Sequence, residues 1–172
     1  MPDFSIEKEY NKNVVGIDEV GRGPLAGPVI SSAVIFFDHQ MNNDSFKLIN
    51  DSKKLSKINR IKIFKIIYQL QETKKIKFSL GMASVKEIDE LNILEATKLS
   101  MKRAVIKLNR PPLPLIIDGK IDLKLKNYPS HGVIKGDQKS LSIATASIIA
   151  KVHRDRYMQF LSYTFPYYNW SS

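Results

Sequence analysis

Two apolar segments near the start of the chain, joined by a loop of glycine and proline, constrain the fold most strongly. The first covers residues 14–18 and ends in acids, and the second covers residues 29–37 (VISSAVIFF). Both are rich in β-branched residues, which favour strands. The intervening GRGPLAGP excludes regular structure, because its glycines and prolines interrupt helices and strands alike. We therefore predict two strands joined by a shaped loop.

Helical and extended patterns alternate along the rest of the chain. Apolar residues at helical spacing predict helices, and continuous apolar runs predict buried strands. The predicted helices cover residues 56–70, with Ser56 as N-cap, 87–108 and 140–161. The predicted later strands cover residues 76–84, 113–118 and 133–134. This order indicates an α/β fold, with a mixed sheet that carries helices on its faces.

The composition indicates one globular domain with an anionic partner. A chain of 172 residues with 43% hydrophobic and 26% charged residues suits a single hydrophobic core. The 27 Lys and Arg against 17 Asp and Glu give a net charge of +10. Such a balance favours nucleic acid or an anionic membrane surface. It also fits a lysine-rich chain whose charge has no specific partner.

Several functional classes are excluded by what the sequence lacks. The absence of cysteine excludes disulfides, thiolate metal sites and a cysteine nucleophile. The three histidines are scattered, which argues against a zinc cluster. Residues 1–15 contain no apolar core of a secretory signal, and no run approaches about 18 apolar residues. We expect a cytoplasmic protein without a membrane span.

Four acids stand at the ends of predicted strands or before a helix. Asp18 and Glu19 close the first strand, Asp118 closes a later one, and Asp137 precedes the last helix. If the two strands are neighbours, these carboxylates meet at one edge of the sheet, where α/β folds place their sites. Oxygen ligands without a soft partner suit Mg²⁺ or Mn²⁺ rather than zinc. Each acid alone also fits a turn, a cap or a surface charge.

The glycine loop follows directly after the first pair of acids. Consecutive residues of a strand point to opposite faces, so the chain must leave the strand toward Gly21 for Glu19 to join Asp18. Gly21, Arg22 and Gly23 offer backbone that a ligand can approach closely and a guanidinium that can bind phosphate. The pattern is neither a P-loop nor a dinucleotide fingerprint. A plain hairpin loop is the alternative interpretation.

Other candidate residues are less specific. Lys53 and Lys54 lie just before a predicted helix, an arrangement that suits phosphate contact, although surface lysines often have no such role. His131 and His153 have no partner at metal-ligand spacing and are expected to be structural or exposed. Aromatic residues near the chain end are expected to pack in the core rather than to stack on bases. They are Tyr157, Tyr163, Tyr167, Tyr168 and Trp170.

The segment VVGIDEVGRGPLAGPVISSAVIF closely resembles the N-terminal signature of the bacterial ribonuclease HII family. The resemblance continues in order over nearly the whole chain. The further matching motifs are NDSKKLS, EIDELNILEAT, LIIDGK, KGDQKSLSIATASIIAKVHRD and FPYY.

This resemblance implies a ribonuclease H-like fold and an endonuclease that cuts the RNA strand of RNA/DNA hybrids, including duplex DNA with a single ribonucleotide. It implies a monomer whose catalytic acids bind two Mg²⁺ or Mn²⁺ ions for in-line hydrolysis. Gly21, Arg22 and Gly23 match the loop that senses the ribose 2′-hydroxyl. Asp155 lies in a matched stretch and is expected to be structural. The acids that match the family's metal ligands are Asp18, Glu19, Asp118 and Asp137.

The resemblance ends where this sequence ends. Relatives continue past FPYYNW into a His-Lys-Gly-Tyr stretch and a further helical segment, so we expect residues 1–172 to form one type 2 ribonuclease H domain truncated at its C-terminus. The missing tyrosine stacks at the RNA–DNA junction in the family. Two alternatives therefore stay open: a domain that binds hybrids but cuts them weakly or not at all, and a generic basic nucleic-acid-binding domain with surface acids.

Overall fold

A five-stranded mixed sheet forms the centre of the computed structural model, which describes residues 1–10, 13–39, 49, 55–168 and 170. The strand order is β3-β2-β1-β4-β5. β1 pairs antiparallel with β2 and parallel with β4, so the sheet is mixed as the sequence predicts. The strands are β1 (Val15–Val20), β2 (Val29–Phe36), β3 (Ile76–Ala83), β4 (Leu115–Asp118) and β5 (Ser130–Val133).

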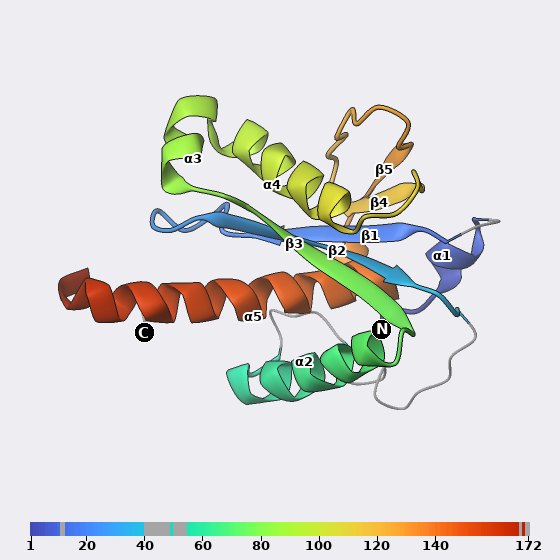
Figure 1. Cartoon of the computed structure of the whole chain (residues 1–172), viewed down its shortest axis with the longest axis horizontal. Coiled ribbons are helices and arrows are strands. Elements are labelled where there is room, and N and C mark those ends of the chain that lie inside the picture. Colours follow the sequence, from blue (N-terminus) through green and yellow to red (C-terminus); the bar gives the residue numbers. More distant parts are fainter. Residues whose placement is uncertain (11–12, 40–48, 50–54, 169, 171–172) are drawn as a thin grey trace.

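Helices cover both faces of this sheet (Figure 1). One face carries α2 and α5, and the other carries α3 and α4. The helices are α1 (Ser5–Lys8), α2 (Lys57–Glu72), α3 (Val85–Leu91), α4 (Ile93–Lys107) and α5 (Leu141–Thr164), and two 3₁₀ turns are η2 (Gly136–Gln138) and η3 (Pro166–Tyr168). A strand between two helical layers must be apolar on both sides, which explains why every residue of β2 is buried.

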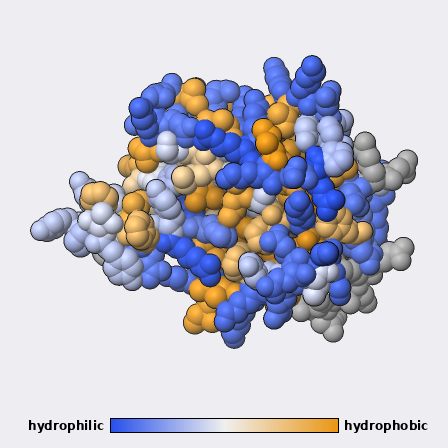
Figure 2. Space-filling model, in the orientation of Figure 1, coloured by the Kyte–Doolittle hydropathy of each residue, from blue (hydrophilic) through white to orange (hydrophobic). Residues whose placement is uncertain are grey.

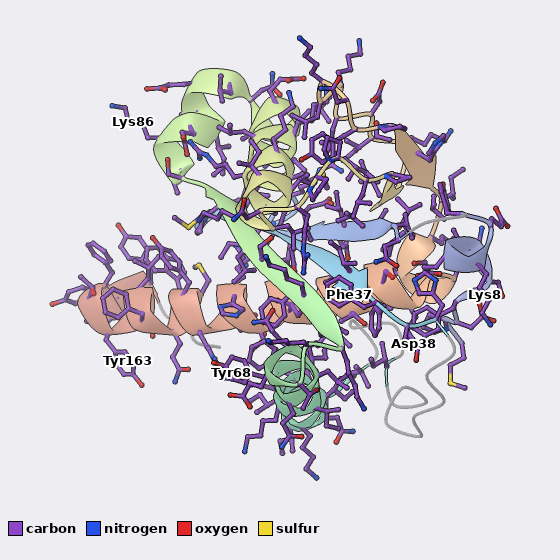
Figure 3. The ribbon with its side chains drawn as sticks, turned by 45° about the vertical axis from the view of Figure 1, so that its right-hand side comes forward. Lys8, Phe37, Asp38, Tyr68, Lys86 and Tyr163 are labelled. Carbon is purple, nitrogen blue, oxygen red and sulfur yellow. The ribbon has the colours of Figure 1, made fainter. Side chains whose placement is uncertain are left out.

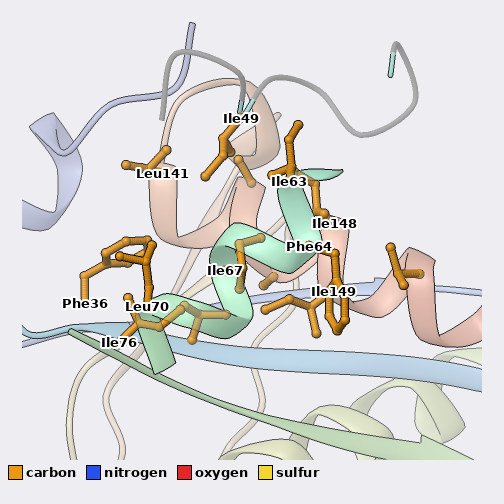
Figure 4. Close-up of a cluster of buried hydrophobic side chains, with 14 of the residues drawn as sticks. Phe36, Ile49, Ile63, Phe64, Ile67, Leu70, Ile76, Leu141, Ile148 and Ile149 are labelled. Atoms are coloured by element: carbon orange, nitrogen blue, oxygen red, sulfur yellow. The ribbon is translucent and has the colours of Figure 1, made fainter. Parts of the chain in front are cut away.

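The hydrophobic core is split by the sheet into two layers. Val34 and Phe36 of β2 pack with Ile67 of α2 and with the start of α5 (Figure 4). Ala33 and Ile35, which point to the opposite face, pack against α4 and β4. The face of the molecule seen in Figure 2 is largely hydrophilic, with apolar groups between the polar ones. Helices on both faces thus hold β1, the central strand, in a fixed position.

The structure corrects several predicted boundaries. The helix expected over residues 87–108 is two helices, because Asn92 adopts a left-handed φ of 70° and its side chain caps α4 by accepting from the N–H groups of Leu94 and Glu95. β1 runs through Val20, beyond its predicted end at residue 18. β5 covers residues 130–133 and excludes Ile134, which is exposed. The short helix α1 was not predicted.

Gly16 allows α5 to lie directly against β1. A Cβ atom added at Gly16 would lie 2.5 Å from the carbonyl carbon of Ser142 and 2.7 Å from the backbone nitrogen of Ile143. Both are backbone atoms at the start of α5, so the contact cannot be relieved by a side-chain rotation. The approach of α5 to β1 therefore depends on the absence of a side chain at this position.

We expect Gly16→Ala to lower the free energy of unfolding by about 1–3 kcal/mol, because overpacking forces the backbone apart. Urea denaturation followed by circular dichroism measures this loss. Gly23→Ala is the matched control, since a Cβ at Gly23 meets no heavy atom within 4 Å. Equal stability of the two variants would contradict this account of the helix–strand contact.

Candidate active site

Three of the four predicted acids line one pocket of about 210 Å³. Its lining includes Asp18 and Glu19 from the end of β1 and Asp118 from the end of β4. β1 and β4 are parallel neighbours, and Ile17 pairs with Ile117, so the next residue of each strand lies at the same edge of the sheet. The other lining residues are Val20, Arg60, Ser147 and Lys151.

Asp18 is the most deeply buried of these three acids, with 6% of its surface exposed. Its Oδ1 atom accepts a hydrogen bond of 2.7 Å from the backbone N–H of Glu19, and its carboxylate also bonds the side chain of Ser147 in α5. Burial raises the pKa of Asp18 well above its ordinary value, and the charges of Glu19 and Asp118 raise it further. The pocket therefore disfavours the full negative charge of its own acids.

Glu19 reaches the same pocket although β1 stays regular through Val20, so the departure from the strand that we expected is not needed. Burial raises the pKa of the Glu19 carboxyl, and the Arg22 guanidinium opposes this rise. Nη1 of Arg22 lies 3.4 Å from Oε1 of Glu19. Asp118 adds a further repulsive charge. Arg22 thus connects the glycine loop to the acid pocket.

Asp137 lies next to the pocket but does not line it. Asp118 Oδ1 accepts a 2.7 Å hydrogen bond from the N–H of Gly136, which precedes Asp137 in η2. Asp137 is buried, with 5% of its surface exposed. This turn follows β5 and precedes α5, and its hydrogen bond to Asp118 holds Asp137 close to the end of β4.

The donor chemistry of the pocket fits a divalent cation of the Mg²⁺ class. Its carboxylate oxygens are hard ligands, and their mutual repulsion and burial would be relieved by a bound positive charge. Within the described residues, however, no three histidine or carboxylate side chains are grouped closely enough to coordinate a metal ion. His131 is exposed in β5, and His153 packs on the Phe64 ring at 5.4 Å, in agreement with the prediction that each is structural or exposed.

Arg154 of α5 donates hydrogen bonds to backbone carbonyls of the glycine loop, a role that the sequence did not predict. Its Nε donates to the carbonyl of Pro28 at 3.1 Å, and its Nη2 donates to the carbonyl of Ala26 at 2.7 Å. Gly21, with φ of 112°, packs so closely that an added Cβ would lie 2.8 Å from Arg154 Nε. The local sequence offered no clear signal, because Arg154 lies among the charged residues Lys151, Asp155 and Arg156 of α5.

The remaining predicted residues have mixed outcomes. Lys53 and Lys54 lie outside the described residues. The aromatic residues near the chain end do not form core, so that prediction is wrong: Tyr163 is 76% exposed and points away from the sheet (Figure 3), and Tyr167 is 98% exposed. Tyr168 stacks on Trp170 at 4.8 Å. The last turns of α5 extend past the edge of the sheet (Figure 1), and these aromatic residues belong to those turns or follow them.

Acids gathered at the carboxyl ends of neighbouring parallel strands, on a mixed sheet with helices on both faces, are typical of a metal-dependent nuclease with an α/β fold. The family model of ribonuclease HII matches residues 15–171. The chain is 49% identical over 169 residues to the ribonuclease HII of Wolbachia pipientis subsp. Culex pipiens (strain wPip), covering 98% of this chain and 81% of that one. The chain belongs to the ribonuclease HII family, endoribonucleases that hydrolyse the RNA strand of RNA/DNA hybrids.

Solved structures of this family share the fold. The ribonuclease H2 of Pyrococcus horikoshii OT3 superposes with a TM-score of 0.73 at 27% identity, covering 90% of this chain and 77% of that one. The ribonuclease HII of Archaeoglobus fulgidus, solved in complex with PCNA, gives a TM-score of 0.72 at 27% identity, covering 90% and 78%. The predicted ribonuclease H-like α/β fold is confirmed.

In the described ranges, no helix is long and apolar enough to cross a membrane.

The raised pKa of Asp18 predicts an unusual dependence of stability on pH. The folded state binds this proton more tightly than the unfolded state, so the stability it contributes is present at low pH and is lost as pH rises through the folded pKa. Asp18→Asn removes the ionised group. We therefore expect Asp18→Asn, in EDTA, to be more stable than wild type at about pH 8, since each pKa unit corresponds to about 1.4 kcal/mol.

The difference should shrink as pH falls to about 4, where the wild-type carboxyl is neutral in the folded state and increasingly so in the unfolded state. Urea denaturation at a series of pH values measures it. Asp89→Asn, at an exposed position of α3, is the control and should show no such gain. A wild type more stable than Asp18→Asn at every pH would contradict the electrostatic account of the pocket.

Proposed function

We propose that this protein both degrades the RNA strand of hybrids and incises duplex DNA at single embedded ribonucleotides, by metal-dependent hydrolysis in the acid pocket. The observation that carries the proposal is the convergence of Asp18, Glu19 and Asp118 on one pocket beside the glycine loop. A site built from carboxylates at a sheet edge suits phosphodiester hydrolysis, because divalent cations bound by such groups stabilise charge at phosphorus.

Two Mg²⁺ or Mn²⁺ ions would be held by Asp18, Glu19, Asp118 and Asp137. When bound, they would lower the pKa of an attacking water and neutralise charge on the phosphate and the leaving 3′-oxygen. Ser147 and the Glu19 N–H fix the orientation of the Asp18 carboxylate, and Gly136 fixes that of Asp118. No side-chain nucleophile is required, and the products carry 5′-phosphate and 3′-hydroxyl ends.

Recognition of the ribose is assigned to Gly21, Arg22 and Gly23. The Arg22 side chain is 43% exposed, and a Cβ at Gly23 meets open space, so a substrate can approach this backbone. The 2′-hydroxyl is the group that distinguishes RNA from DNA at one position. Arg154 keeps the loop in place through the carbonyls of Ala26 and Pro28. The contact between Arg22 and Glu19 supports a role of the loop and the acids at the same nucleotide.

With Mg²⁺ or Mn²⁺, we expect the wild-type protein to cleave an end-labelled hybrid and a duplex with one ribonucleotide. Asp18→Asn should lower the rate at least about 100-fold, as expected when a group that stabilises the transition state is lost. Asp89→Asn should cleave at the wild-type rate, because Asp89 is exposed on α3. Wild-type cleavage by Asp18→Asn would refute the assignment, and binding without cleavage by the wild type would favour the hybrid-binding alternative.

Mg²⁺ should also raise the thermal stability of the wild-type protein. A ligand that binds only the folded state stabilises it by about 2.7 kcal/mol at 100 times its dissociation constant. Asp118→Ala should remove most of this stabilisation, whereas Asp89→Ala should retain it. Calorimetric scans with Mg²⁺ and with NaCl of equal ionic strength separate the specific effect from charge screening. Equal Mg²⁺ stabilisation of both variants would place the cation elsewhere.

A further inference from the structure

The acid pocket also has a cationic lining that the proposed mechanism leaves without a role. Arg60 of α2 and Lys151 of α5 line the same 210 Å³ pocket as Asp18, Glu19 and Asp118. Their side chains are 11% and 34% exposed, respectively. Positive groups beside an acid cluster usually neutralise it by direct pairing. The role of Arg60 and Lys151 therefore depends on which carboxylates they pair with.

Asp155 of α5 pairs with both cations. Lys151 Nζ lies 2.6 Å from Oδ1 of Asp155, one helical turn along α5, and Arg60 Nη2 lies 3.9 Å from Oδ2. One carboxylate thus holds an ammonium and a guanidinium from two different helices close together. Lys151 lines the pocket, but its ammonium group bonds Asp155. The side chain is therefore held close to the pocket acids by a carboxylate that is not one of them.

Lys151 and Asp155 also border a second cavity, of about 650 Å³. This cavity lies beside the glycine loop, since Pro24, Leu25 and Ala26 belong to its lining. Further cations on its walls are Lys57 and Arg154, and its aromatic wall is formed by Tyr168 and Trp170. Lys151 therefore stands where the acid pocket meets a larger cavity with an excess of positive charge, and an anionic strand that left the pocket along α5 would pass it.

We propose that Arg60 and Lys151 form a phosphate subsite for the nucleic-acid strand, and that Asp155 is the positioning residue that holds them. This inference rests on the proposed function, because it takes the phosphate to be that of an RNA/DNA hybrid. A phosphodiester offers two non-bridging oxygens, and a guanidinium with an ammonium supplies the charge-assisted donors for them. The acids hold the reacting centre, and these cations hold a phosphate of the same strand.

A set of ion pairs that binds no ligand is the competing interpretation. In that case the three side chains only pair with one another at the surface of α2 and α5 and contact no phosphate. The two interpretations differ in the expected effect of Asp155→Asn. Removing a negative charge beside a polyanion should tighten hybrid binding if Asp155 is only a nearby charge, but should weaken it if Asp155 orients Arg60 and Lys151.

The test measures binding of a fluorescent RNA/DNA hybrid by anisotropy in EDTA, where no cleavage occurs. We expect Lys151→Met to weaken binding about tenfold and to reduce the slope of log affinity against log salt by about 0.9, as for one lost phosphate contact. Lys65→Met is the matched control, because it removes the same charge from an exposed position of α2. Lys151→Arg should restore most of the affinity.

Asp155→Asn should weaken binding several-fold despite its added net positive charge. Thermal denaturation of each variant confirms that it is folded, and Asp155→Asn keeps the size of the side chain. Unchanged binding by Lys151→Met, or tighter binding by Asp155→Asn, would overturn the subsite even if Asp18-dependent cleavage is observed. Weakened binding by both variants in a protein that does not cleave would support the subsite and count against the proposed nuclease activity.

Discussion

The parallel pairing of β1 with β4 is the constraint on which the rest of the structure depends. It brings two chain segments about 100 residues apart into register, so that Asp18 and Asp118 follow the paired residues Ile17 and Ile117 at one edge. Neither strand could do this alone. The pairing is possible because both strands are apolar enough to be buried between helical layers. The first residues of β1 therefore pack in the hydrophobic core, and its last residues carry the acids of the pocket.

The helix α5 organises the site because its residues contact β1, the acid pocket and the glycine loop. Its first turn packs on Gly16, Ser147 bonds Asp18, and one and two turns later come Lys151 and Arg154. These positions recur at helical spacing, so a single rigid element fixes the acids, the cationic lining and the glycine loop relative to one another. A site built on a helix and two strands is more precise than one built on loops alone.

The sequence predicted those parts that depend on local pattern. The loop after β1 was predicted because its glycines and prolines interrupt strands and helices, and Gly21 and Gly27 adopt positive φ values there. Asp18, Glu19 and Asp118 were predicted because they end apolar runs, and Asp137 because it precedes a helix. The parts that depend on distant contacts were not. The break at Asn92 is hidden in a continuous amphipathic pattern, and the supporting role of Arg154 depends on carbonyls about 126 residues away in the chain. The prediction that the terminal tyrosines pack in the core was wrong, because aromatic character alone does not show where α5 extends past the sheet.

Glu7 shows how the start of α5 is held in place. It is fully buried, and its Oε1 accepts hydrogen bonds from the Ser140 hydroxyl at 2.6 Å and the Ser142 N–H at 2.8 Å, at the start of α5. A negative group at a helix N-terminus is stabilised by the helix dipole. The N-terminal segment thus fixes the end of α5 that adjoins η2 and its Asp137. The helix that carries Ser147 to Asp18 is therefore fixed at its first turn by a buried acid.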